Sequence, residues 1–91
     1  MANLTFKSKP LRQLFADGKV RRISPQLTKK LLGLLDHLDA AATKSDLAIA
    51  GFHELKGSRK GTYAWTVTGN WRLTFRFEDG NAFDIDLEDY H

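Results

Sequence analysis

The chain contains no cysteine among its 91 residues. This absence excludes disulfide bonds and metal sites built from thiolates. The sequence also lacks an apolar run near the roughly 20 residues that a membrane-spanning helix needs, and its first residues include no apolar stretch typical of a signal peptide. We therefore expect a cytoplasmic protein that does not associate with membranes.

Length and charge set further limits. A chain of 91 residues has room for one hydrophobic core, so we expect a single domain over residues 1–91. The 42% content of apolar residues is ordinary for a globular protein. A formal net charge of +3 favours polyanionic partners, such as nucleic acids.

Only two prolines occur, and both stand where a helix is expected to begin. Ser8 precedes Pro10, and Ser24 precedes Pro25; serine is a favoured N-cap and proline is tolerated in the first helical turn. The first predicted helix ends at Gly18, which is a typical C-terminal residue. The second carries leucines at helical spacing, namely Leu27, Leu31, Leu34, Leu35 and Leu38. A further short turn is expected to begin near residues 45–46.

The rest of the chain has the alternation of half-buried β-strands. Aromatic and branched apolar residues occupy alternate positions across residues 62–67, 71–77 and 82–88. Turn-forming residues separate these runs, namely Thr68-Gly69-Asn70 and Asp79-Gly80-Asn81. Residues 4–6 are expected to form a short strand at an edge of the sheet.

Burial of one face selects a register for the last hairpin. A two-residue turn would mix polar and apolar faces, whereas a three-residue turn separates them. The predicted pairs are Arg76 with Asp84, Thr74 with Asp86, Arg72 with Glu88, Phe77 with Phe83, Phe75 with Ile85, and Leu73 with Leu87. We therefore predict an α+β fold in the order β-α-α-β-β-β, with two helices covering the apolar face of an antiparallel sheet.

Side chains suited to acid–base chemistry concentrate in two places. The first holds His53, Lys56, Arg59 and Lys60, and the second holds Asp89, Tyr90 and His91. If the alternation of the last strand continues, Tyr90 joins Glu88 and Arg72 on the polar face of the sheet. The predicted register therefore brings the second group next to Arg72.

These side chains suit cleavage of RNA without a metal ion. A base removes the proton of the 2′-hydroxyl, an acid protonates the leaving 5′-oxygen, and cations stabilise the phosphorane. Histidine is the natural acid or base near neutral pH. Arginine and lysine supply the positive charge.

Each candidate also has a purely structural interpretation. His53 could be a hydrogen-bonded surface residue, and His91 could be a disordered terminal residue. Lys56, Arg59 and Lys60 could form a solvated loop. Arg72 and Arg76 most simply form cross-strand ion pairs with Glu88 and Asp84, and Asp89 could also balance Arg72. A third basic cluster is either a solvated face or a surface for RNA or the ribosome; it contains Arg21, Arg22, Lys29 and Lys30.

Other residues are interpreted as structural only. His37 is expected on the surface of the leucine-rich helix, and Trp65 and Trp71 fall on core positions of their strands. The three histidines include no pair at ligand spacing, so we predict neither a zinc site nor any cofactor.

Three separated segments resemble the HigB toxins of bacterial toxin–antitoxin systems. They are His53-Glu54-Leu55-Lys56-Gly57-Ser58-Arg59-Lys60-Gly61, Gly69-Asn70-Trp71-Arg72-Leu73-Thr74-Phe75-Arg76-Phe77 and Asp89-Tyr90-His91. Their order and spacing match the family, and the resemblance extends over nearly the whole chain. It implies the RelE-like fold of the RelE/ParE superfamily, in agreement with the layout above.

The resemblance also implies a function. Proteins of this family are toxins that cut mRNA in the decoding site of the ribosome, without a metal or cofactor. The implied partners are a HigA-like helix-turn-helix antitoxin, the ribosome with bound mRNA, and operator DNA only through the antitoxin complex. Matched by position, the family's catalytic set corresponds to His53, Asp89, Tyr90 and His91, and its phosphate-contacting positions to Lys56, Arg59 and Arg72.

The division of labour within that set stays open. We expect His53 and His91 to share the acid and base roles, Asp89 to orient or assist one of them, and Tyr90 to position the nucleotide. Two other functions are weighed against cleavage: a non-nuclease toxin of the same fold that inhibits DNA gyrase, as ParE proteins do, and a basic RNA-binding module.

Overall fold

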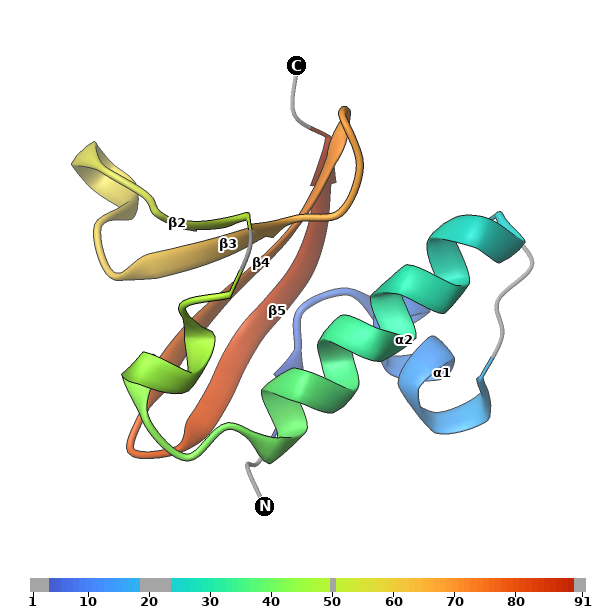
Figure 1. Ribbon diagram of the computed structural model, residues 1–91, viewed down its shortest axis with the longest axis horizontal. Helices are drawn as coiled ribbons and strands as arrows, with labels where there is room; N and C mark the ends of the chain where they lie inside the picture. The colour runs from blue at the N-terminus through green and yellow to red at the C-terminus, as the bar shows by residue number, and fades with distance from the viewer. Residues whose placement is uncertain (1–3, 19–23, 50, 90–91) are drawn as a thin grey trace.

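Two helices pack on one face of a five-stranded sheet in the computed structural model, which describes residues 4–18, 24–49 and 51–89 (Figure 1). The elements, in chain order, are β1 (Leu4–Phe6), α1 (Lys9–Asp17), α2 (Pro25–Ala40), the 3-10 turn η1 (Lys44–Leu47), β2 (Phe52–Glu54), the 3-10 turn η2 (Gly57–Arg59), β3 (Thr62–Thr66), β4 (Trp71–Glu78) and β5 (Asn81–Asp89). No described helix has the length and apolar character required to cross a membrane.

Both helices begin as the serine–proline signals predict. The hydroxyl groups of Ser8 and Ser24 accept hydrogen bonds from the backbone amides of Leu11 and Leu27, each at 3.3 Å. Gly18 ends α1 in the left-handed conformation, with φ of 80°, which glycine adopts without a steric penalty. The short turn predicted near residues 45–46 is present as η1, although its N-cap is Thr43.

The hydrophobic core lies between the helices and the sheet. Fully buried side chains come from both layers, namely Leu11, Leu14, Leu31, Leu35 and Leu38 from the helices and Trp65, Leu73, Phe75 and Ile85 from the strands. The indole N–H of Trp65 donates a 2.8 Å hydrogen bond to the carbonyl of Leu47, so the one polar atom of this ring is satisfied inside the core. The core interpretation of Trp65 is therefore confirmed, and Trp71 packs against the same core at its edge.

The strand order is β1-β5-β4-β3-β2. The short N-terminal strand lies at an edge, as predicted, and pairs in parallel with β5, so the sheet is mixed. β2 was not predicted, because three residues are too few to show an alternating pattern. It pairs antiparallel with β3 and places His53 opposite Ala64.

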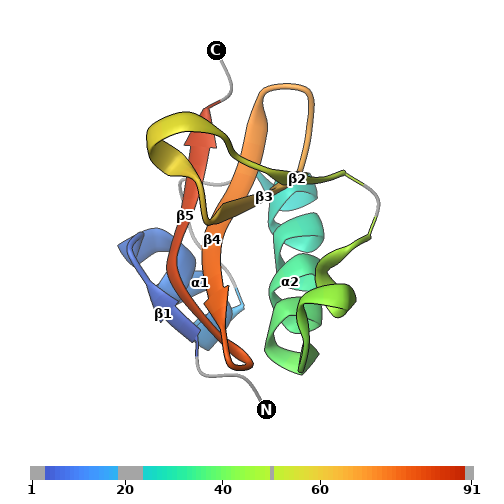
Figure 2. The same cartoon turned by 90° about the vertical axis from the view of Figure 1, so that its left-hand side faces the viewer.

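The predicted register holds for the central part of the sheet. Tyr63 pairs with Phe75 on β3 and β4, and on β4 and β5 Thr74 pairs with Asp86 and Arg72 with Glu88. The polar face of the sheet, which lies opposite the helices (Figure 2), therefore carries the predicted arginines and carboxylates.

The register predicted for the rest of the last hairpin is wrong. The structure pairs Arg76 with Phe83 instead of Asp84, and Phe77 with Ala82 instead of Phe83. A β-bulge lies between Thr74 and Arg76. The turn is consequently a two-residue one at Asp79–Gly80, flanked by the pair Glu78 and Asn81. The prediction assumes one register along the whole hairpin, whereas the bulge allows the two-residue turn at one end and the predicted pairs at the other.

Candidate active site

The pairing of β2 with β3 places His53 on the polar face of the sheet. Across the four strands β2, β3, β4 and β5, one row of paired residues consists of His53, Ala64, Thr74 and Asp86. Residues paired in this way point to the same face. His53 is exposed, and its strand neighbour Ala64 is small and buried. An accessible imidazole therefore stands on the same face as the predicted cations of β4.

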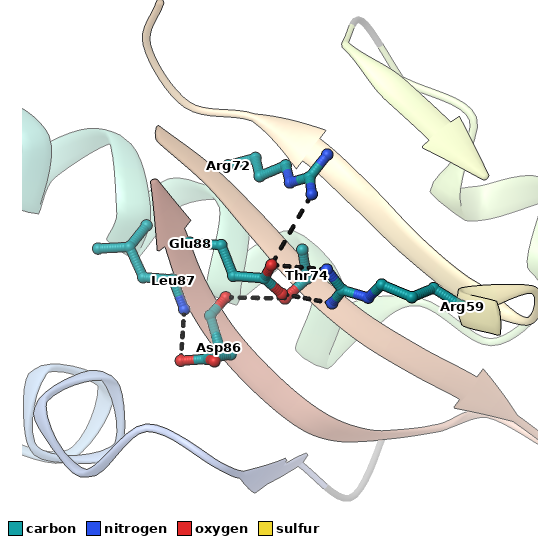
Figure 3. Close-up of polar contacts among 6 residues, drawn as sticks. All are labelled: Arg59, Arg72, Thr74, Asp86, Leu87 and Glu88. Carbon is teal, nitrogen blue, oxygen red and sulfur yellow. Dashed lines mark hydrogen bonds and ion pairs between the residues drawn. The ribbon is translucent and has the colours of Figure 1, made fainter. Parts of the chain in front are cut away.

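Glu88 is the centre of the charged network on this face (Figure 3). Arg59 binds both carboxylate oxygens of Glu88 through its two terminal nitrogens, at 2.7 Å and 2.5 Å. Thr74 donates its hydroxyl hydrogen to Glu88 at 2.6 Å. The guanidinium of Arg72 lies 3.8 Å from the same carboxylate. The cross-strand ion pair expected for Arg72 is thus present, and a second arginine shares its partner.

The Arg59 contact could not be found by sequence reasoning, because Arg59 and Glu88 are 29 positions apart. Arg59 reaches from η2 across β4 to β5 (Figure 3). The turn that carries it begins at Gly57 and is followed by Gly61, and the φ angles of these residues, 70° and 94°, favour glycine. The fork uses two of the five N–H donors of the guanidinium.

The fork also changes the acidity of Glu88. The hydrogen bonds from Arg59 lower the pKa of Glu88 from its ordinary 4.5 to about 2, with further contributions from the Thr74 hydroxyl and the positive charges of Arg59 and Arg72. Glu88 is therefore ionised at neutral pH. Its side chain is 23% exposed and that of Arg59 is 42% exposed, so part of the pair is open to solvent.

Glu88 should make the stability of the protein sensitive to acid. A carboxyl whose pKa is lowered by folding contributes stability that is fully present above pH 4.5 and is lost as the pH falls towards about 2. We expect Glu88→Gln to be less stable than the wild type at pH 7, and this difference to shrink at pH 3. Denaturant unfolding at both pH values measures it, with Glu78→Gln at the exposed end of β4 as the matched control. A difference between Glu88→Gln and the wild type that stays constant with pH would contradict this role for Glu88.

A pocket of about 360 Å³ adjoins this network. Its lining combines cations, carboxylates and hydroxyl groups. The lining residues are Lys7, Ser58, Arg59, Thr62, Thr74, Arg76, Asp84, Asp86 and Glu88. Such a lining offers both donors and acceptors of hydrogen bonds. Among the described residues, no group of three or more His, Cys, Asp or Glu side chains is arranged to hold a metal ion.

The structure connects the other predicted site residues less directly with the network around Glu88. Lys56 is exposed and lies directly before η2. Asp89 is the last residue of β5, and its register partner is Trp71 rather than Arg72. Tyr90 and His91 lie outside the described residues. The structure thus brings together Arg59 and Arg72, places His53 on their face of the sheet, and leaves the remaining members of the predicted set as predictions from sequence.

The structure also bears on His37, on the third basic cluster and on Arg76. His37 is exposed on α2 as expected, and its Nε2 lies 2.7 Å from the backbone carbonyl of Asp46. Within the third basic cluster, Lys29 and Lys30 are exposed on α2, whereas Arg21 and Arg22 lie outside the described residues. The predicted ion pair of Arg76 with Asp84 is replaced by a contact of Arg76 with the ring of Phe83.

Known proteins resemble this chain over its whole length. A family of sequences described as RelE-like toxins HigB of type II toxin–antitoxin systems matches residues 4–91. The endoribonuclease HigB of Proteus vulgaris is 37% identical over 89 residues, which cover 96% of this chain and 97% of that protein. The toxin HigB-1 of Vibrio cholerae is also 37% identical over 89 residues, covering 93% and 94% of the two chains.

Solved structures share the fold at lower identity. A YoeB/ParE toxin from Agrobacterium tumefaciens superposes with a TM-score of 0.67 at 17% identity, over 98% of this chain and 99% of that chain. The YoeB–YefM complex from Staphylococcus aureus gives a TM-score of 0.65 at 20% identity, over 100% and 97% of the two chains. These structures confirm the α+β architecture of two helices on one face of a sheet.

Proposed function

Because this chain belongs to the HigB-like family of RelE-like toxins from type II toxin–antitoxin systems, we propose that it is an endoribonuclease that cuts mRNA on the ribosome. The observation that carries the proposal is the polar face of the sheet, where His53 lies on the same face as Arg59 and Arg72. An accessible imidazole beside fixed guanidinium groups supplies what phosphodiester cleavage needs. The name of the Proteus vulgaris relative supports the same activity.

The proposed reaction is transesterification by acid and base. One histidine of the pair His53 and His91 removes the proton of the 2′-hydroxyl, and the other protonates the leaving 5′-oxygen. Asp89 orients or assists one of them, and Tyr90 positions the nucleotide. No metal ion takes part in this mechanism.

The cations stabilise the charge that develops on the phosphorane. Arg59 and Arg72 are suited to this role because Glu88 restrains both guanidinium groups over the sheet before RNA arrives. A group that is already in place loses less conformational entropy when the transition state forms. Lys56, exposed directly before η2, adds a third positive charge at the edge of the same face.

The proposed partners follow from membership of the family. We infer a HigA-like helix-turn-helix antitoxin that neutralises the toxin, with operator DNA contacted only through that complex. YoeB from Staphylococcus aureus, which has a similar fold, has been solved in complex with YefM, including a heterotetrameric complex of the two proteins. The substrate would be mRNA in the decoding site, and the toxin would act in the cytoplasm.

Cleavage of one mRNA in the presence and absence of translating ribosomes tests the proposal. We expect cleavage products with ribosomes and none with free mRNA. A parallel supercoiling assay covers the ParE-like alternative, in which DNA gyrase is inhibited and the mRNA stays intact. Binding to ribosomal complexes without either effect would instead identify a basic RNA-binding module.

A further inference from the structure

The β-bulge in the last hairpin moves an aromatic ring to the polar face. Without the bulge, Phe83 would pair with Phe77 and face the helices. With it, Phe83 pairs with Arg76, and cross-strand partners share a face. The guanidinium carbon of Arg76 lies over the Phe83 ring, 5.4 Å from its centre. Phe83 is only partly buried, so part of its side chain is open to solvent.

The backbone conformation that permits this arrangement is unusual. Asp84, the residue after Phe83, has a φ angle of 54°. Aspartate tolerates the left-handed region better than most residues, but a residue other than glycine rarely adopts it. Such conformations cluster at binding and active sites. The position of Asp84 in the lining of the polar pocket fits that tendency.

We propose that Phe83 and Arg76 form a stacking site for an unpaired nucleobase of the mRNA, on the same face of the sheet as the proposed site of cleavage. The inference rests on the proposed function and adds a subsite to it. Proteins commonly hold single-stranded nucleic acid by stacking bases on aromatic rings and on the planes of guanidinium groups. Here the ring and the guanidinium are already in contact, so a base can stack against a surface that is prepared before binding.

The surroundings favour single-stranded RNA as the occupant. Asp84 and Asp86 line the neighbouring pocket and can accept hydrogen bonds from the exocyclic amino group of a base. Lys7 and Arg59 line it as well and can bind backbone phosphates. The site is also continuous with the proposed active site, because Arg76 and Arg72 project from the same face of β4. Arg72 and Arg76 are four positions apart along the strand, or roughly 13 Å.

The test uses mRNA that carries 2-aminopurine near the cleavage position and is bound to ribosomes. For Phe83→Leu we expect KM for this mRNA to rise at least about fivefold, which corresponds to the loss of one stacking contact, while kcat stays close to that of the wild type. A 2′-O-methyl group at the scissile nucleotide blocks cleavage and allows binding to be followed alone. Quenching of the 2-aminopurine fluorescence on binding should then be seen with the wild type and lost with Phe83→Leu.

Matched variants separate stacking from packing. Phe83→Tyr keeps an aromatic ring and should restore both KM and quenching. Phe77→Leu makes the same change on the helix-covered face, since Phe77 pairs with buried Ala82, and should leave KM unchanged. Arg76→Gln removes an exposed side chain and should raise KM even if Phe83→Leu folds poorly.

The inference would be overturned if Phe83→Leu and Arg76→Gln kept the KM and the quenching of the wild type, or if Phe77→Leu raised KM as much as Phe83→Leu. Failure of the proposed function gives a different result. In that case the wild type itself would not cut the mRNA, whichever residue stands at position 83.

Discussion

Replacing His53 with alanine should slow cleavage of ribosome-bound mRNA by at least about 100-fold, which is the usual contribution of one general acid or base. The fold should be unaffected, because His53 is exposed on the short strand β2. The backbone pairing of this strand with β3 does not depend on the imidazole. Single-turnover cleavage and thermal unfolding of the same preparation measure the two effects.

His37→Ala is the matched control for that experiment. His37 is also an exposed histidine, but it lies on α2, where its ring contacts the backbone of Asp46 and the edge of Trp65. We expect its loss to leave the cleavage rate unchanged. Equal rates for His53→Ala and the wild type would remove His53 from the proposed mechanism, whatever the rest of the site does.

Removing residues 89–91 should abolish cleavage and spare most of the stability. The expected loss is large because these residues include one of the two proposed histidines, together with Asp89 and Tyr90. The stability should change little, since Asp89 is the exposed last residue of β5 and the buried residue Ile85 lies well before it. The measurement is again cleavage with ribosomes, combined with denaturant unfolding.

Alanine at all three positions provides a variant of unchanged length. It should be as inactive as the deletion and as stable as the wild type. His91→Ala alone should account for most of the lost rate. If the deletion retained cleavage, the site would have to be sought elsewhere on the polar face, and the assignment by resemblance would be wrong for these residues.

The two helices and the polar face of the sheet could be predicted because their signals are local. Ser8 and Ser24 cap the helices, and the alternation on β4 and β5 separates arginines and carboxylates from the core. β2 could not be predicted, because its three residues show no period. The strand matters to the proposed function, since it sets the face on which His53 lies.

The missed features of the site depend on long-range geometry. Nothing local links Arg59 to Glu88, because their contact requires η2 to fold back across β4. The bulge was missed for another reason. Separation of the polar and apolar faces predicts one register along the whole hairpin, and no local signal in the sequence marks the bulge near Asp84 where the register changes.

These features together form the proposed RNA-binding face, which is largely organised without the substrate. Glu88 holds two guanidinium groups in place, and the bulge presents Phe83 beside Arg76. Preorganised groups of this kind act in the transition state without paying the cost of being ordered first. The account therefore predicts specific losses of activity from substitutions that leave the core intact.

Primer extension on mRNA from cells that express the chain tests the central claim most directly. The account predicts new 5′ ends within coding regions when the wild type is expressed, and none when His53→Ala or His91→Ala is expressed at the same level. The same experiment also reports which codons are cut. Intact mRNA in cells whose growth is inhibited by the wild type, or equal cutting by the wild type and both variants, would contradict the account.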